Sequence, residues 1–298
     1  MAGATQTGTT DPAVADGDLA AREERLEEIL RRLGSVVLGY SGGVDSTLLL
    51  AKALEVLGAG NVLAVTAATP TYAAEEVDEA VRLAERLGAR HARIESSELE
   101  DEGFLANPPE RCYYCKTDLY GDLRELAAER GYAAVIDGSQ ADDELDWRPG
   151  LKALDEQGIA SPLREAGLSK ADVRELSRRL GLPTAEKPAN ACLASRFPYG
   201  NRITPAALER VGRAERAARA LGFDVVRVRD HGDVARIEVP PERRERLLAV
   251  SDELVPRLKA LGYVWVAIDA EGYRSGSMNE ALGQAGEGGR VSGGPEDG

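Results

Sequence analysis

The sequence predicts an α/β fold in which a parallel β-sheet with helices on both faces is followed by a smaller α+β domain. Two observations carry this prediction. Along residues 35–139, continuous apolar segments, which are typical of buried parallel strands, alternate with amphipathic helical segments. After residue 203 the order changes to helix, strand, strand, helix and strand, which indicates a second domain with its own sheet.

The elements of the first domain are expected in a regular order. A buried strand at residues 35–38 leads into a helix that begins near Thr47, whose leucines recur at helical spacing. Further strands are expected at residues 61–66, 89–96 and 133–139, with helices at 73–87 and 116–131. Ligands bind beyond the carboxyl ends of parallel strands, so the polar strand ends at 39–46, 66–69 and 137–143 are candidate site segments.

The second domain, residues 203–280, is expected to open with a helix that Thr204 caps and Pro205 begins. Two paired strands should flank a turn at residues 231–233, followed by a helix at 241–261 and a last strand at 263–269. Residues 1–17 and 281–298 are rich in small and polar residues and are expected to be disordered tails. These boundaries leave residues 18–202 for the first domain.

Composition limits the classes of function. The formal net charge of −14 over 298 residues argues against a large nucleic-acid-binding surface, which requires basic side chains. No apolar run approaches the roughly 20 residues that cross a bilayer, and the first residues lack the basic start and apolar core of a signal peptide. With three cysteines and no targeting segment, the chain is expected to be cytoplasmic, where thiols stay reduced.

The stretch "VVLGYSGGVDSTLLLAKAL" turns sharply from a strand into a helix through two glycines. A helix that starts this way directs its first N–H groups and its positive dipole end at the loop, which favours binding of phosphate. Gly43 is expected to need a positive φ or to let phosphate approach its backbone closely. The candidate ATP-binding residues are Ser41, Gly42, Gly43, Asp45, Ser46 and Thr47.

Other interpretations of this loop are a tight turn with capping hydroxyls and a hydrolase nucleophile elbow. The letters at residues 39–43 fit G-x-S-x-G, but only one strand precedes Ser41, and the chain offers only His91 and His231 for a catalytic triad. No lysine follows the glycines, so the loop is not a Walker loop. The string S-G-G-x-D-S instead resembles the PP-loop ATP pyrophosphatase superfamily, with its adenine nucleotide alpha hydrolase-like fold. Its members adenylate a substrate and release pyrophosphate.

The third strand end is strongly acidic. Carboxylates crowd residues 137–146, at Asp137, Asp142, Asp143, Glu144 and Asp146. A solvated acidic loop is one interpretation, and a Mg²⁺ site that serves ATP is another, because Mg²⁺ takes hard oxygen ligands. PP-loop relatives commonly carry D-G-T-N-x-D-D here, and this chain has Ser139 and Gln140 at the Thr and Asn positions. Asp45 is a further candidate Mg²⁺ ligand.

The three cysteines suggest a second type of site. Cys112 and Cys115 form a C-x-x-C pair before a helix, and Cys192 lies in "KPANACLASRF". A redox pair, half of a zinc site, or buried thiols would each explain the C-x-x-C pair. Near Cys192 in the sequence lie three cations that would lower its pKa if they were close in space, Lys187, Arg196 and Arg202.

Several metal arrangements fit these cysteines. Three thiolates could hold three irons of a [4Fe–4S] cluster and leave the fourth iron open for sulfide. A zinc ion with His91 or His231 as fourth ligand is the rival, and binding of no metal stays open.

Several further strings carry a closer resemblance. "SGGVDS", "RCYYCK", "DGSQADDELDWRPG", "CLASRFPYGNRIT" and "DAEGYRSGSMN" together resemble the LarE family of sulfur transferases, over residues 19–280. That family works in the biosynthesis of the nickel-pincer nucleotide of lactate racemase-type enzymes. The resemblance implies that ATP and Mg²⁺ activate the carboxylates of pyridinium-3,5-biscarboxylate mononucleotide, which then become thiocarboxylates. It also implies a small-molecule nucleotide as substrate, with a homo-oligomer and a sulfide-donating protein as further expectations.

Within that family the number of cysteines separates two mechanisms. Some members carry one cysteine at the position of Cys192, surrender its sulfur and keep dehydroalanine. Others carry the additional C-x-x-C and resemble a cluster-dependent type, so Cys112, Cys115 and Cys192 are expected to bind a [4Fe–4S] cluster here. Cys192 is the candidate catalytic residue in either case. A sacrificial Cys192 and a tRNA-thiolating PP-loop enzyme are the alternatives, as is a PP-loop ligase that uses ammonia or glutamine.

An anionic nucleotide substrate also needs cations. Arg227, Arg229 and Arg236 alternate with apolar residues, which predicts a cationic strand face, although a solvated face fits as well. Arg274, in "EGYRSGS", and Arg229 are the candidates for the substrate phosphate. Glu215 and Asp233 are candidate acidic groups near the site, and His231 is expected to be structural.

Overall fold

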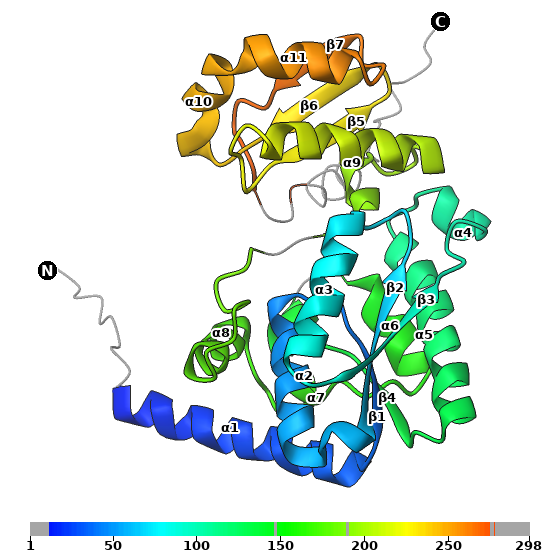
Figure 1. Cartoon of the computed structure of the whole chain (residues 1–298), viewed down its shortest axis with the longest axis vertical. Coiled ribbons are helices and arrows are strands. Elements are labelled where there is room, and N and C mark those ends of the chain that lie inside the picture. The colour runs from blue at the N-terminus through cyan, green and yellow to red at the C-terminus, as the bar shows by residue number, and fades with distance from the viewer. Residues whose placement is uncertain (1–11, 146–147, 189–190, 275–276, 278–298) are drawn as a thin grey trace, which may run out of the picture. The chain divides into compact units, whose positions relative to one another are not determined.

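The computed structural model describes residues 12–145, 148–188, 191–274 and residue 277 (Figure 1). The chain divides into two compact units, each assembled from segments that are distant in the sequence. The first unit comprises residues 1–68, 75–95 and 117–189, and the second comprises 69–74, 96–116 and 190–298. The domain boundaries expected from the sequence stay a prediction.

The first unit contains a parallel sheet of β1 (Val36–Gly39), β2 (Val62–Ala68), β3 (Arg90–Glu95) and β4 (Ala134–Ile136), which confirms the predicted α/β fold. The strand order is β3-β2-β1-β4 (Figure 1), so β1 has a neighbour on both sides. In the register, Val36 of β1 lies opposite Val62 of β2 and Ala134 of β4. The loop after β1 therefore leaves the sheet at its middle, where open α/β sheets bind ligands.

Helices cover both faces of this sheet, as the sequence predicts. Alternate residues of β1 point to opposite sides: Val36 and Leu38 pack with one apolar cluster, and Val37 with another. The helices of this unit are α1 (Pro12–Leu33), α2 (Val44–Leu57), α3 (Ala74–Arg86), most of α5 (Arg111–Arg130), α6 (Pro149–Glu156), α7 (Pro162–Glu165) and α8 (Lys170–Arg179), with short 3₁₀ turns η1 (Ala59–Asn61) and η2 (Ala141–Leu145).

Helix α1 differs from the expected tail. It begins at Pro12, so residues 12–17 are helical, while residues 1–11 and the expected tail 281–298 lie outside the described residues. Leu19, Leu26 and Leu30 recur at helical spacing and are buried, which explains why this segment packs as a helix. Lys52 of α2 also holds it, through its ion pair with Glu27 of α1 at 2.7 Å.

The second unit contains a three-stranded sheet in the order β5-β6-β7. Strands β5 (Arg227–His231) and β6 (Val234–Glu238) are antiparallel, as expected, and β7 (Trp265–Ile268) runs parallel to β6. Its helices are α4 (Glu102–Leu105), α9 (Pro205–Arg219), α10 (Arg244–Ala249) and α11 (Ser251–Lys259), with 3₁₀ turns η3 (Leu193–Arg196) and η4 (Pro241–Arg243). The hydroxyl of Thr204 accepts a hydrogen bond from the N–H of Ala207 at 3.2 Å, which confirms the predicted cap of α9.

The single helix expected at residues 241–261 is two helices. Val250 ends α10 and begins α11, because its φ of −102° and ψ of 10° depart from helical values. This break keeps Leu247, Leu254 and Leu258 buried in the same apolar core. None of the helices in the described ranges combines the length and the apolar character needed to cross a membrane.

Candidate active site

The phosphate-loop candidate, residues 40–43, presents the open amino end of a helix. Gly43 is the N-cap of the 14-residue helix α2, and no side chain caps it. The N–H groups of the first turn therefore remain directed at the loop, where they can bind an anion. A positive φ occurs at Gly42 (67°) and not at Gly43 (−80°), so the expectation of a positive φ at Gly43 is wrong, while a close approach of phosphate to its backbone stays a prediction.

Gly42 is required for a second reason. A Cβ at this position would lie 2.8 Å from the Cβ of Ala80 in α3, which is closer than side chains tolerate. At Gly43 a Cβ would lie 3.3 Å from the hydroxyl of Ser41, which can rotate away. The loop therefore passes α3 so closely that only glycine fits at residue 42.

The three predicted hydroxyls of this loop differ in availability. Ser41 is exposed, and its oxygen lies 3.1 Å from that of Ser46 and accepts a hydrogen bond from the N–H of Gly43 at 3.3 Å. Thr47 is fully buried, and its hydroxyl lies 3.2 Å from the hydroxyl of Tyr40. Ser41 and Ser46 are thus the hydroxyls nearest the open helix end, while Thr47 secures the strand that leads into it.

Lys170 is a candidate that the sequence did not indicate. It is the first residue of α8, and its ammonium lies 2.7 Å and 2.5 Å from the two carboxylate oxygens of Asp45. A reciprocal capping box between Ser169 and Asp172 fixes the start of α8, and Asp142 accepts the N–H of Lys170 at 2.8 Å. The S-x-x-D pattern at 169–172 could have marked a helix start. The contact between Lys170 and Asp45, however, depends on tertiary packing, which a local sequence pattern does not reveal.

Lys187 is a second cation at the loop. The sequence grouped it with Cys192, and the structure places its ammonium 3.2 Å from the carbonyl oxygen of Gly42 and 3.1 Å from the carboxylate of Glu79. The guanidinium of Arg174 holds the chain at this point by donating to the carbonyl of Lys187 at 3.1 Å. Two ammonium groups therefore lie beside the open end of α2, where phosphates would bind.

The acidic loop after β4 packs against the phosphate loop. A Cβ at Gly138 would lie 3.1 Å from the backbone nitrogen of Ser46, so this glycine permits the close approach. Asp137 accepts from the hydroxyls of Ser139 and Ser161, each at 2.9 Å. Asp143 accepts from Gln140 at 2.9 Å and pairs with Arg148 at 2.8 Å.

These carboxylates thus stabilise their own loop, and a Mg²⁺ ion there would have to displace protein donors. Asp146 lies outside the described residues.

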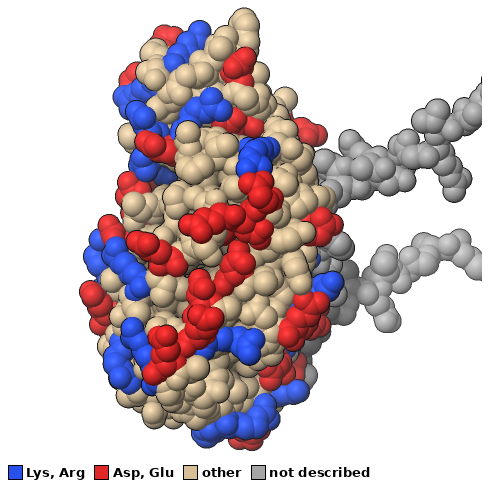
Figure 2. Space-filling view, turned by 90° about the vertical axis from the view of Figure 1, so that its right-hand side faces the viewer, with Lys and Arg blue, Asp and Glu red and all other residues tan. Residues whose placement is uncertain are grey.

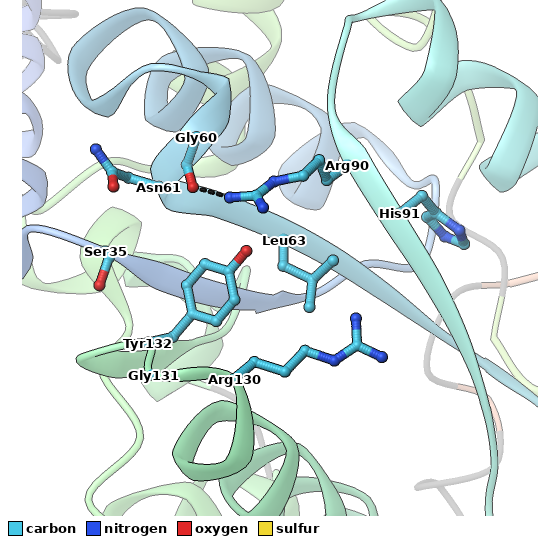
Figure 3. Close-up of a pocket in the computed structure, with 9 residues that line it drawn as sticks. All are labelled: Ser35, Gly60, Asn61, Leu63, Arg90, His91, Arg130, Gly131 and Tyr132. Atoms are coloured by element: carbon cyan, nitrogen blue, oxygen red, sulfur yellow. Dashed lines mark hydrogen bonds between the residues drawn. The ribbon is translucent and has the colours of Figure 1, made fainter.

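A pocket of about 440 Å³ lies at the amino ends of the strands of the same sheet, whereas the phosphate loop follows the carboxyl end of β1 (Figure 3). Its lining residues precede or begin the strands, and they include Arg90, Arg130 and Tyr132. Arg90 donates to the carbonyls of Ala59 and Gly60, which follow the end of α2, and Arg130 is in the last turn of α5. Cations at helix ends satisfy carbonyl dipoles, so this pocket has a structural explanation.

In the second unit, the three cysteines are free thiols, with Cys112 exposed and the other two half-buried. Cys115 and Cys192 pack beside the same apolar cluster. Burial, and then Cys192, Cys115 and Glu98, raise the pKa of Tyr72 well above its ordinary value, because these groups lie near one another. Burial, followed by Glu98 and the other two cysteines, also raises the pKa of the Cys115 thiol, which therefore keeps its proton at neutral pH.

The cysteine-bearing segments are tied together by hydrogen bonds. Asn107, in the turn before α5, donates to the carbonyls of Pro198 and Asn201, which follow Cys192 in the sequence. The N–H of Leu193 donates to the carbonyl of Thr71 at 2.7 Å. Among the described residues, however, no three His, Cys, Asp or Glu side chains already form a metal-binding group.

The arginines near Cys192 in the sequence bind carboxylates. Arg196 pairs with Glu215 at 2.7 Å, and Arg202 pairs with Glu102 at 2.7 Å. Arg196 also donates to the carbonyl of Cys192 at 3.3 Å, so its positive charge positions this segment. Each guanidinium thus already faces a carboxylate, and its action on the Cys192 thiol stays a prediction.

The expected cationic strand face is neutralised. Buried Arg229 pairs with Glu238 on the neighbouring strand at 2.7 Å, and Arg236 pairs with Asp269 at 2.6 Å. Arg229 also donates to the carbonyl of Ser195 at 2.8 Å, which links β5 to the segment that carries Cys192. Arg236 also pairs with Glu238 of its own strand at 3.2 Å. The other two pairs join separate strands or a turn, and the alternation of residues along one strand does not reveal such partners.

The remaining candidates each have partners or positions of their own. Arg274 pairs with Glu271, and Glu215 is fully buried among Arg196 and Arg219. Asp233 lies in the turn between β5 and β6, where its carbonyl accepts the N–H of Trp265 at 3.0 Å. His231 ends β5, while His91 belongs to the first unit and lies 2.9 Å from the Thr66 hydroxyl. The assignment of these residues to substrate stays a prediction.

A parallel sheet whose central strand delivers S-G-G-x-D-S to an uncapped helix end defines a PP-loop nucleotide-binding domain, and residues 19–102 match the NAD synthase family. The chain is 44% identical over 267 residues to the pyridinium-3,5-bisthiocarboxylic acid mononucleotide synthase of Lactiplantibacillus plantarum, covering 90% of this chain and 97% of the relative. The chain therefore belongs to the same family as this synthase, the LarE family that its sequence resembles.

Two further relatives show how far the similarity extends. An uncharacterized protein of Synechocystis sp. is 44% identical over 266 residues, which cover 89% of this chain and 99% of the relative. The NH(3)-dependent NAD(+) synthetase of Chlorobaculum tepidum is 30% identical over 167 residues, covering 54% of this chain and 58% of the relative. The similarity to the synthetase is thus partial, whereas the family similarity spans nearly the whole chain.

Proposed function

We propose that this chain is an ATP-dependent sulfur transferase acting on pyridinium-3,5-biscarboxylate mononucleotide, whose ring carboxylates it converts to thiocarboxylates. The observation that carries the proposal is the 44% identity to the L. plantarum synthase over 97% of that protein. The product would serve the nickel-pincer nucleotide of lactate racemase-type enzymes. The open amino end of α2 supports the ATP-dependent half of the reaction.

In the first step, a ring carboxylate oxygen attacks the α-phosphorus of ATP, and pyrophosphate leaves. The resulting acyl-adenylate carries no carboxylate charge, so an anionic nucleophile can attack its carbonyl carbon. The N–H groups that follow Gly43 would hold the departing pyrophosphate, and Ser41 and Ser46 would donate to its oxygens. PP-loop enzymes usually use Mg²⁺ with ATP, and Mg²⁺ would share the negative charge of the phosphates.

Lys170 and Lys187 extend this phosphate site. Both ammonium groups are within hydrogen-bond distance of loop atoms, Lys170 at Asp45 and Lys187 at the carbonyl of Gly42. When ATP binds, Lys170 can exchange its bond to Asp45 for a phosphate oxygen, which frees the carboxylate to ligate Mg²⁺.

In the second step, sulfur attacks the acyl-adenylate and AMP leaves. Cys112, Cys115 and Cys192 would hold a [4Fe–4S] cluster, and such a cluster would leave one iron without a protein ligand, where sulfide could bind. The donor set fits because Cys192 and Cys112 both lie close enough to Cys115 to raise its pKa, and because Asn107 joins the segments that carry them. Loading would require side-chain rotation and loss of the thiol protons, since ligating sulfurs are thiolates.

The substrate and its partners follow from the same proposal. Arg229 and Arg274 are the candidates for its phosphate, and each would have to exchange a carboxylate partner for it. Figure 2 shows extensive groups of Asp and Glu on the face it presents, consistent with the net charge of −14 and with a partner other than nucleic acid. A homo-oligomer and a sulfide-donating protein complete the proposal.

The deciding experiment supplies the purified chain with Mg²⁺–ATP, sulfide and the biscarboxylate nucleotide under anaerobic conditions. Mass spectrometry should show exchange of oxygen for sulfur in the nucleotide, with one AMP and one pyrophosphate formed per exchange. A parallel reaction with unmodified tRNA tests the thiolating alternative. Sulfur in the tRNA and none in the nucleotide would overturn the proposal.

A further inference from the structure

Asn107 has an unusual backbone conformation for its residue type. Its φ is 53°, the one positive value among the described residues other than glycine, and its side chain is fully buried. Asparagine tolerates the left-handed region better than most residues, particularly where its amide bonds to nearby backbone. Such a conformation in a buried turn indicates that the surrounding contacts hold it in place.

The amide of Asn107 binds one segment with its nitrogen. That nitrogen donates to the carbonyl of Pro198 at 2.8 Å and that of Asn201 at 3.0 Å, with Phe197 at a longer 3.4 Å. The backbone carbonyl of Asn107 accepts the N–H of Gly200 at 2.8 Å. These partners all lie in the turn that follows Cys192 and η3.

The amide oxygen of Asn107 binds the other segment. It accepts from the guanidinium of Arg111 at 2.7 Å, and Arg111 is the first residue of α5. That guanidinium also lies over the ring of Tyr199, 5.0 Å from its centre, so Arg111 contacts both segments as well. Arg111 directly precedes Cys112, and Cys115 lies one helical turn further along α5.

This arrangement does more than fill space. An amide offers two donors and one acceptor oxygen, and here each kind is used for a different segment. Asn107 is 90, 91 and 94 residues away in the sequence from the three carbonyls that it binds, so the register of the two segments depends on tertiary bonds of this type. Three sulfurs that ligate one cluster must be placed within roughly half an ångström, which loosely joined segments would not maintain.

We infer that Asn107 is a positioning residue that sets the distance of Cys192 from the C-x-x-C pair. The inference rests on the proposed function, which gives this distance its role in sulfur transfer. The distance itself can be measured in the chain without ATP, substrate or cluster. Arg111 assists by extending the same contact to Tyr199.

The test uses the full metal-free chain and dibromobimane, a reagent that joins two nearby thiols. Mass spectrometry of the digested product gives the ratio of links between Cys192 and α5 to the link between Cys112 and Cys115. Asn107→Gly keeps the backbone conformation available and removes the amide. The ratio should fall by about tenfold, the change expected when about two hydrogen bonds no longer restrain the segments.

Two further variants separate positioning from general loosening. Asn107→Asp can still accept from Arg111 but cannot donate to the carbonyls, and it should lower the ratio like Asn107→Gly. Thr204→Ala removes the cap of α9, also in the second unit, and should leave the ratio unchanged. An unchanged ratio in Asn107→Gly, or an equal fall in Thr204→Ala, would overturn the inference.

A titration with Co²⁺ links this distance to metal binding. In the wild-type chain, Cys192→Ala should lower the thiolate–cobalt absorption, because all three thiolates bind the metal. In Asn107→Gly the same additional substitution should leave the absorption unchanged, because Cys112 and Cys115 alone bind it. If Asn107→Gly binds Co²⁺ with all three thiolates, the inference is wrong. A chain that passes both tests and transfers no sulfur would contradict the proposed function and leave the positioning role intact.

Discussion

Arg196 and Glu215 form a two-point ion pair in the interior of the second unit, with nitrogen–oxygen distances of 2.7 Å and 3.1 Å. The side chains are 1% and 0% exposed, so neither charge is solvated. Arg196 also donates to the carbonyl of Ala191 at 2.9 Å, immediately before Cys192. The pair therefore connects α9 to the segment that carries the candidate catalytic cysteine.

Glu215→Ala should strongly destabilise the chain. Removal of one partner leaves the Arg196 guanidinium buried without a counter-charge, which costs about 3–5 kcal/mol. The free energy of unfolding from urea titration measures this. Glu209→Ala, on the exposed side of the same helix, is the matched control and should change it by less than about 0.5 kcal/mol. Equal values for the two variants would contradict the role of the pair.

The same pair predicts a dependence of stability on pH. Burial alone would raise the pKa of Glu215, but Arg196, Arg227 and Arg219 outweigh it, and the net pKa lies below 4.5. A carboxyl whose folded pKa is lowered stabilises the fold above its unfolded pKa and loses that contribution as the pH falls. Urea titrations should show stability falling below about pH 4.5, with a smaller fall in Glu215→Gln.

Gly42→Ala should abolish substrate-dependent release of pyrophosphate. Alanine at a φ of 67° is strained by about 1–2 kcal/mol, and its Cβ would lie 2.8 Å from that of Ala80. The loop must shift, which moves the N–H groups at the start of α2. A coupled pyrophosphate assay measures the loss, and circular dichroism checks that the chain still folds. Gly60→Ala, where a Cβ meets no atom within 4 Å, should retain wild-type release.

Lys170→Met should weaken the use of ATP. Loss of one charge-assisted contact with phosphate costs about 1.5–3 kcal/mol, or roughly 10- to 150-fold in kcat/KM for ATP. Initial rates of pyrophosphate release over a range of ATP concentrations measure this. Lys152→Met, whose side chain is 72% exposed in α6, serves as the control for loss of a positive charge. Equal rates for the wild-type chain and Lys170→Met would show that Lys170 does not contact the phosphates.

Cys112→Ala separates the two sources of sulfur. If three thiolates hold a cluster, this variant should lose iron and repeated turnover, while the wild-type chain keeps its intact mass after many turnovers. Anaerobic iron and sulfide assays and intact-mass spectrometry make both measurements. A wild-type chain that becomes lighter by one H₂S at Cys192, with Cys112→Ala equally active, would establish the sacrificial mechanism.

Much of the fold followed from local patterns. The apolar runs predicted parallel strands, and β1, β2, β3 and β4 form them. The string S-G-G-x-D-S located the loop between β1 and α2, and Thr204 marked the start of α9. Each of these depends on residues a few positions apart, because hydrogen-bond periodicity and capping act over short distances along the chain.

Other features were decided by tertiary structure alone. Lys170 reaches Asp45 across 125 residues of sequence, and Asn107 reaches Asn201 across 94. The sequence predicted that Arg229 could bind an anion, whereas the structure pairs it with Glu238 on the neighbouring strand. Residue types and short spacings determine which groups a chain can offer. Which charge faces which carboxylate depends on how strands and helices from distant segments pack, because electrostatic and hydrogen-bond energies act over a few ångströms in space.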